Sequence, residues 1–212
     1  MLKTLLVHAS RWDASHEVFS RVLQSSPLKK NVERHKRRNF LSRFFGFGRV
    51  DLARVISCTD TTVTAIGFGT LDHNMSHVYS FPLPPSLSSI RCKRHFIVTL
   101  GWFTPIMPQN QKYKAASLKL KCDKDIAGKT IDSDFVSTAR GTVIHVLYEK
   151  SAAQVISDGD ELNVTIECQI HDNFHKESIP YGLAVTLEIE DSITVPIYNE
   201  IAERIKQRIE IA

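Results

Sequence analysis

Two histidine pairs have the i, i+4 spacing that places two metal ligands on one face of a helix: His73/His77 and His171/His175. Neither pair lies in a helical pattern. His77 enters an alternating run, and the second pair lies in the polar segment HDNFHKESIPYG. No cysteine is placed to complete either site. We therefore interpret the four residues as ordinary loop histidines and predict no metal ligand.

Two pairs of acidic residues have a spacing of two, which could suggest calcium binding or acid–base catalysis: Asp132/Asp134 and Asp158/Asp160. A calcium loop needs more oxygen ligands at fixed spacing and a closing glutamate, which neither segment provides. Both pairs are better interpreted as turns, and Gly159 strengthens this for the second pair. No segment presents a nucleophile, a base and an orienting group together, so we predict no catalytic residue.

The stretch Gly46-Phe47-Gly48 precedes a short helix-like run at 50–56 and invites comparison with phosphate-binding loops. A dinucleotide fingerprint needs a third glycine, where this chain has Asp51, and it follows an apolar strand, whereas the preceding segment here is basic. The triplet Gly-Lys-Ser/Thr is absent. The glycines therefore indicate a turn before a helix, and no cofactor is predicted.

The four cysteines are far apart and form no Cys-x-x-Cys pair: Cys58, Cys92, Cys122 and Cys168. Cys122 and Cys168 continue alternating apolar faces, which favours a role as small buried residues. The N-terminal apolar run is short and is broken by charged residues, so it does not resemble a signal peptide. No run approaches the length of a membrane span. We expect a cytoplasmic protein without structural disulfides.

The 212 residues include 42% hydrophobic and 24% charged residues, which is typical of a globular chain. The formal net charge of +4 is unevenly distributed, because residues 29–43 (KKNVERHKRRNFLSR) contain seven Lys/Arg and one Glu. This basic run could contact phosphate groups or an acidic partner. A solvated insertion is the simpler interpretation, since aromatic residues flank the run and do not interleave it.

The apolar spacing predicts helices at both ends of the chain. Residues 1–24 place one set of apolar side chains on a common face, and Ser25-Ser26-Pro27 ends the pattern. This set comprises Leu2, Leu5, Leu6, Ala9 and Trp12, and a second set comprises Val18, Phe19, Val22 and Leu23. In the tail, 196–212, a stripe at i+4 spacing predicts an amphipathic helix that docks on the core or on a partner: Ile197, Ile201, Ile205 and Ile209.

Seven segments with strand character occupy the middle of the chain: 61–68, 76–81, 95–103, 116–122, 141–149, 161–170 and 182–190. Several alternate strictly between apolar and polar residues, which indicates one buried face. The fold class is therefore α+β: N-terminal helices, an antiparallel, jelly-roll-like β-sandwich and a C-terminal helix.

Three segments in order resemble the C-terminal portion of large bacterial subtilisin-like serine proteases (subtilases): LKTLLVHASRW, GFGRVDLARV and VTLGWFTP. In that family a helix similar to residues 5–9 follows the helix of the nucleophile, and a turn similar to residues 46–50 closes the catalytic domain. Larger members continue into a β-sandwich. The resemblance implies a catalytic-domain remnant at 1–56, an accessory sandwich at 57–195 and a tail helix at 196–212.

The resemblance also implies what is missing. The family uses an Asp/His/Ser triad in the motifs Asp-Ser/Thr-Gly, His-Gly-Thr and Gly-Thr-Ser-x-Ala. None of the three occurs here: Gly69-Thr70 and Gly141-Thr142 lack the serine, Asp60-Thr61 lacks the glycine, and no histidine precedes a glycine. We expect all three triad residues to precede Met1. The chain alone is expected to be inactive, with the missing protease half or another protein as its partner.

Two alternatives remain open. A stand-alone binding module could hold a protein, a glycan or a nucleic acid, with the aromatics Trp102, Phe103, Tyr113 and Tyr181 as a stacking surface. Core packing is the favoured interpretation for Trp102, which lies at the end of the most apolar strand. Nucleic-acid binding is disfavoured and would depend on the basic run: Arg34, Lys36, Arg37 and Arg38. An independent hydrolase has the least support, because no acid–base set converges.

Overall fold

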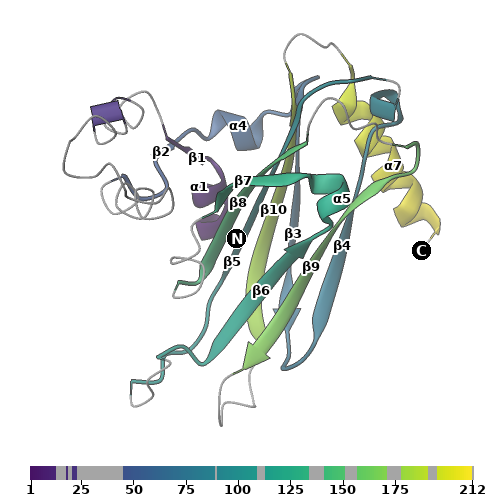
Figure 1. Ribbon diagram of the computed structural model, residues 1–212. Helices are drawn as coiled ribbons and strands as arrows, with labels where there is room; N and C mark the ends of the chain where they lie inside the picture. The colour runs from purple at the N-terminus through teal and green to yellow at the C-terminus, as the bar shows by residue number, and fades with distance from the viewer. Residues whose placement is uncertain are drawn as a thin grey trace.

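The computed structural model shows two antiparallel β-sheets packed face to face, with helices at the margins (Figure 1). The structure describes residues 1–12, 18, 21–22, 45–88, 90–108, 113–133, 141–150, 157–170, 178–190 and 195–211. Within these residues no helix is long and apolar enough to span a bilayer. The basic run at 29–43 and the pair His171/His175 lie outside the described residues.

The larger sheet has five strands in the order β3-β10-β5-β8-β7. Their bounds are β3 Thr62–Leu71, β10 Ile179–Ile189, β5 Arg94–Trp102, β8 Val143–Lys150 and β7 Lys129–Ser133. Strands β5 and β10 are buried at nearly every position, whereas β8 alternates between buried and half-buried residues. The two central strands are therefore covered on both faces.

The smaller sheet has three strands in the order β4-β9-β6: β4 Ser76–Pro82, β9 Glu161–Ile170 and β6 Ala116–Cys122. Strand β9 alternates cleanly, since Leu162, Val164 and Ile166 have no exposed surface. They pack in the common core with residues from the larger sheet, such as Phe96 and Leu187. The outward residues of this sheet are mainly polar, as expected for a sheet with one solvated face.

All seven strands that the sequence predicts are confirmed, and all the strand pairs are antiparallel. The prediction ends the first strand near Gly69, but β3 continues to Leu71 because its backbone pairs with β10 along its whole length. Strand β7 was not predicted. It follows a single helical turn, α5 (Lys124–Ala127), and it pairs with β8 through an irregular register.

The prediction of one continuous helix over residues 1–24 is wrong at residues 9–12, whereas Val18, Arg21 and Val22 are helical as predicted and the other residues of 13–24 lie outside the described residues. Helix α1 covers only Leu2–His8, and the chain then forms a short strand, β1 (Ser10–Arg11), antiparallel to β2 (Arg49–Val50). The hydroxyl of Ser10 donates to the Leu6 carbonyl at 2.7 Å, which occupies an acceptor at the helix end. Pairing with a distant strand thus overrides the local helical pattern.

The prediction for the run at 50–56 is wrong in part for the same reason. Val50 belongs to β2, and only Ala53–Ile56 form a helix, α4. The preceding glycines do form a turn, with positive φ at Gly46 (56°) and Gly48 (98°). A Cβ at Gly48 would lie 2.2 Å from the Arg11 carbonyl oxygen, so close backbone approach requires glycine here.

Helix α7 (Ile197–Ile211) docks on the sandwich beside β3 and β4, as Figure 1 shows. Ile197 and Ile201 are buried in the core, which confirms docking by the first half of the predicted stripe. Ile205 is 37% exposed, and the side chain of Ile209 lies outside the described residues. The Arg204 guanidinium donates to the Leu83 carbonyl at 2.8 Å and helps to fix the helix.

The packing predicts that Leu162→Ala destabilises the protein by about 2–5 kcal/mol, because it leaves a cavity between the two sheets. The control is Val78→Ala on the outer face of the same sheet, where the side chain is 60% exposed. We expect this change to stay within about 0.5 kcal/mol. Chemical denaturation measures both, and equal losses would contradict the assignment of the two faces.

Candidate functional site

The most elaborate polar arrangement in the described chain lies between α1 and the outer face of the five-stranded sheet. Gly101 and Gly182 are cross-strand partners on β5 and β10, and together they leave room for Thr4. A Cβ at Gly101 would lie 2.7 Å from Thr4 Oγ1, and one at Gly182 would lie 2.8 Å from the Met1 sulfur. The Thr4 hydroxyl donates to the Gly182 carbonyl at 3.3 Å. The glycine pair thus lets α1 approach the sheet closely.

One turn further along α1, His8 is 1% exposed and uses both ring nitrogens. Its Nδ1 lies 2.7 Å from Thr99 Oγ1 on β5, and its Nε2 lies 2.6 Å from Thr186 Oγ1 on β10. Each threonine hydroxyl makes a second hydrogen bond to the next strand: Thr186 Oγ1 is 2.7 Å from Thr64 Oγ1 on β3, and Thr99 Oγ1 is 2.7 Å from His145 Nδ1 on β8. We call these five residues the His8 hydrogen-bond chain. It crosses four adjacent strands and includes the helix.

The His8 hydrogen-bond chain stabilises the neutral form of the imidazole. Burial lowers the pKa of His8 to about 3, and the positive charges of His145 and Arg11 act in the same direction. The partners of the ring are hydroxyl groups that carry no charge. The site therefore holds a histidine that stays uncharged at neutral pH, which suits structural pairing and offers no base to solvent.

Two charged contacts fix the ends of the same segment. Arg11 pairs with Glu188 on β10 at 3.1 Å. Lys3 donates to the Trp102 carbonyl at 2.9 Å and to the Thr142 hydroxyl at 2.6 Å, and burial lowers its pKa. These contacts hold residues 1–12 on the sheet between β10 and Thr142, the residue that precedes β8.

The side of α1 that meets the sheet is its polar side. Thr4 and His8 are 1% exposed, whereas Leu2 is 73% and Leu6 is 40% exposed. Among the predicted apolar set only Ala9 is fully buried, and Leu5 is half-buried. Polar residues reach the sheet because only hydrogen-bonding side chains match the threonines and backbone carbonyls that face α1. Leu2 and Leu6 are left on the outside.

More exposed apolar side chains lie on the elements near α1. Phe68 on β3 is 78% exposed. Its cross-strand partner on β10 is Gly182, the glycine against which Met1 packs. Others, on β3, β2 and the segment of α4, are Ile66 (51%), Val50 (43%), Leu52 (49%) and Ile56 (75%). We call Leu2, Leu6, Ile66 and Phe68 the outer apolar face.

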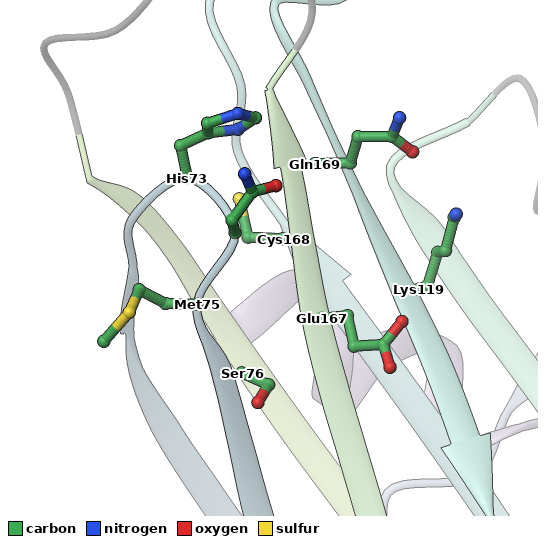
Figure 2. Close-up of a pocket in the computed structure, with 8 residues that line it drawn as sticks. His73, Met75, Ser76, Lys119, Glu167, Cys168 and Gln169 are labelled. Atoms are coloured by element: carbon green, nitrogen blue, oxygen red, sulfur yellow. The ribbon is translucent and has the colours of Figure 1, made fainter.

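A separate depression of 540 Å³ lies beside the β3–β4 turn and the three-stranded sheet (Figure 2). Its lining is mostly polar: His73, Asn74, Met75, Ser76, Lys119, Glu167, Cys168 and Gln169. In Figure 2, Glu167 and Gln169 project from β9 beside Lys119 from β6, and His73 lies at the turn.

The depression lacks the groups that covalent catalysis needs. Burial raises the pKa of the Cys168 thiol to about 11, so a thiolate is scarce at neutral pH. His73 Nδ1 accepts the Ile170 amide proton at 3.1 Å, and Glu167 pairs with Lys121 at 2.5 Å. Within the described residues, no interaction engages the side chains of Lys119 and Gln169. The depression can therefore offer hydrogen bonds to a small polar ligand, but it holds no activated nucleophile.

The other predicted candidates are dispersed. His77 contacts the Tyr181 hydroxyl at 2.6 Å, away from the Ile170 amide that His73 binds. Within the described residues, no group of three or more His, Cys, Asp or Glu side chains could hold a metal ion. Asp158 and Asp160 do lie at a turn, where Gly159 has φ 92°. The backbone of Asp132 belongs to β7, whereas Asp134 lies outside the described residues.

The aromatic residues considered as a stacking surface divide into two groups. Trp102 and Tyr181 are buried, with 1% and 4% exposed. Burial and a hydrogen bond with Tyr79 raise the pKa of the Tyr181 phenol above its ordinary range. Phe103 and Tyr113 are exposed, at 63% and 57%. A stacking surface made by all four residues is therefore excluded.

Sequence reasoning missed His8, Thr99 and Thr186, the centre of the His8 hydrogen-bond chain. One signal was available: each threonine interrupts an apolar run, HFIVTLGWF or GLAVTLEIE, which also contains a glycine. Such runs indicate strands buried on both faces. A buried threonine on the outer face then needs a polar partner, although its identity is not encoded nearby.

No protein-family model matches this chain, and no curated protein matches it significantly.

The close approach of α1 predicts that Gly182→Val displaces the helix while the sandwich stays folded. Valine would clash with Met1 and Thr4, and the cost of overpacking is about 1–3 kcal/mol. Hydrogen–deuterium exchange should show that amides of residues 5–9 lose protection by roughly tenfold or more. Ser76→Val on the smaller sheet is the control for valine in a strand. Unchanged protection in Gly182→Val would refute the close contact.

The thiols provide a second test. Cys58 is exposed, Cys92 and Cys168 are buried, and burial raises the pKa of Cys122 and of Cys168 to about 11. At pH 8 such thiols are thiolates on the order of one time in a thousand. We expect iodoacetamide to modify Cys58 first in the folded protein and the others only after denaturation, as mass spectrometry of the peptides would show. Rapid modification of Cys168 would contradict its burial.

Proposed function

We propose that this chain is the C-terminal part of a bacterial subtilisin-like serine endopeptidase: the end of the catalytic domain, residues 1–56, joined to an accessory β-sandwich, residues 57–195, and a tail helix. In this proposal the chain contributes no catalytic residue. Its role is to complete and hold a catalytic half that carries the Asp/His/Ser triad. The motif order in the sequence supports the assignment, and the arrangement of α1 supports the role.

The observation that carries the proposal is the reversed orientation of α1. Lys3, the only lysine of α1, points toward the sheet and donates to the Trp102 carbonyl. Leu2 and Leu6 face outward. A helix that is polar toward its own sheet and apolar on the other side is suited to lie between two layers of protein. The outer apolar face then becomes the contact with the catalytic half.

The difference between the two sheets supports the same arrangement. The outer face of the smaller sheet is mainly polar, with residues such as Ser80, Asn163, Lys119 and Lys121. The larger sheet carries residues 1–12 and 45–56 and the exposed apolar side chains near them. Large exposed apolar patches often mark interaction sites.

The strand order supports a jelly-roll connectivity for the accessory domain. In a jelly roll, a long antiparallel ribbon folds over, so that the first strand pairs with the last, the second with the seventh and the third with the sixth. Counting from β3, these pairs correspond to β3–β10, β4–β9 and β5–β8. The remaining pair differs, because β7 joins β8 in the larger sheet. We therefore propose a jelly roll that is modified at its fifth strand.

A stand-alone, non-enzymatic binding module is the second candidate. The depression in Figure 2 favours it, since Lys119 and Gln169 there have no interaction with other described residues. Both candidates suit a reducing, cytoplasmic setting, which the four free cysteines support.

The proposal is tested first by translating the DNA upstream of the Met1 codon in all forward frames. We expect Asp-Ser/Thr-Gly, His-Gly-Thr and Gly-Thr-Ser-x-Ala in that order. The upstream polypeptide, mixed with this chain, should hydrolyse a casein substrate and react with a fluorophosphonate probe at its own serine. This chain alone should do neither. An upstream region without the motifs would favour the binding module.

The same mixture tests the outer apolar face. Leu2→Glu/Leu6→Glu should reduce the restored hydrolysis at least about tenfold, because charges would be buried at the contact. Val78→Glu is the matched control, since Val78 is 60% exposed on the smaller sheet. It should change the rate less than about twofold. Equal effects of the two variants would contradict the proposal that α1 contacts the catalytic half.

A further inference from the structure

The His8 hydrogen-bond chain has only two consistent arrangements of its protons. A neutral imidazole has one donor and one acceptor, and each threonine hydroxyl donates once. In the first arrangement Thr64 donates to Thr186, which donates to His8 Nε2, while His8 Nδ1–H donates to Thr99 and Thr99 donates to His145. In the second arrangement all four bonds are reversed. The direction of every bond is therefore set by the proton positions on the two histidines.

Protonation affects the two histidines differently. When His145 carries a charge, its Nδ1–H must donate to Thr99, which selects the second arrangement and leaves His8 neutral. A charge on His8 itself would lie 6.4 Å, centroid to centroid, from the His145 ring, at a position that is 1% exposed. Two charged rings so close together repel each other, so the docked segment resists a proton on His8.

The other groups around His8 do not neutralise such a charge. From β1, Arg11 adds a second positive charge, and from β10, Glu188 is already paired with Arg11 at 3.1 Å. Strands β5 and β3 contribute the hydroxyls of Thr99 and Thr64. When α1 is released, by contrast, water solvates the charged ring freely.

We propose that the His8 hydrogen-bond chain is an acid-sensitive switch: protonation of His8 releases α1 from the five-stranded sheet while the β-sandwich stays folded. The switch is a property of this chain and does not depend on the protease proposal. It gives the protein a means of changing its outer apolar face with pH, because Leu2 and Leu6 leave the sheet together with His8.

The sign of the pH dependence follows from linkage. The docked ring has a pKa of about 3, against 6.5 in an unfolded segment. Docking is therefore unaffected above about pH 6.5 and weakens roughly tenfold per pH unit below it, by up to about three orders of magnitude near pH 3. A helix of seven residues is not stable alone, so release also unfolds it.

The two tryptophans of the chain report on the two parts separately. Trp12 adjoins β1 and donates to the Gly46 carbonyl at 3.1 Å, whereas Trp102 is 1% exposed in the sandwich core. The emission of Trp12, taken as the difference between the wild type and Trp12→Phe, should shift to the red as the pH falls below about 6. The emission of Trp102, measured in Trp12→Phe, should stay constant until the core unfolds. Simultaneous changes in both would overturn the proposal.

Three variants test whether protonation of His8 causes the change in Trp12 emission. His8→Gln keeps a donor and an acceptor but does not titrate, so Trp12 should stay docked until the core unfolds. His95→Gln, on the same sheet but outside the chain of bonds, should behave as the wild type does. Glu188→Gln should keep the transition. If His8→Gln retains the wild-type transition, or Glu188→Gln abolishes it, His8 is not the trigger.

A direct measurement on the wild type tests the switch even if α1 of His8→Gln is already released from the sheet at neutral pH. In the wild type, ¹⁵N NMR of the imidazole nitrogens follows protonation of the His8 ring, and the amide signals of α1 follow docking. The two titrations should share one midpoint. Protonation of the ring while the α1 signals stay unchanged would refute the switch.

Discussion

The arrangement of the molecule depends on the burial of β5 and β10 on both of their faces. The inner faces meet the smaller sheet in the core, whereas the outer faces carry Thr99 and Thr186, which have 0% and 2% of their surface exposed. Buried hydroxyls cost free energy unless they are hydrogen-bonded, so the layer above these strands must supply polar atoms at fixed positions. His8 does this with both ring nitrogens. The position of α1 is thus set by polar pairing, with little contribution from its leucines.

This pairing also limits where α1 can lie. A helix held by leucines on a flat sheet can shift with little loss, because apolar contacts are not directional. An imidazole that must meet two threonines on adjacent strands fits at one place only, and the slot above Gly101 and Gly182 admits Thr4 at one place only. The pairing therefore fixes the orientation of the apolar residues on the opposite side of the helix.

The sandwich could be predicted from the sequence because its information is local. Alternation in segments such as 161–170 identifies strands and their buried faces, and each of the seven predicted strands is present. The sequence did not predict strand β7 because this strand is short and its pairing with β8 is irregular. The end of α1 at His8 was not predicted because β1 pairs with a strand almost forty positions away, at Arg49–Val50. The pattern at the N-terminus is truly helical, and a long-range pairing overrides it.

The His8 hydrogen-bond chain was hidden for a deeper reason. An apolar stripe on a terminal helix normally predicts which face is buried, and here that inference selects the wrong face. The rule assumes that the helix has one protein neighbour, and it fails when polar residues meet the sheet and leucines point away. The failure is itself informative, since the two faces of α1 differ in chemistry. The polar face meets the sheet of this chain, and the exposed leucines of the other face are the reason why we propose a contact with the catalytic half there.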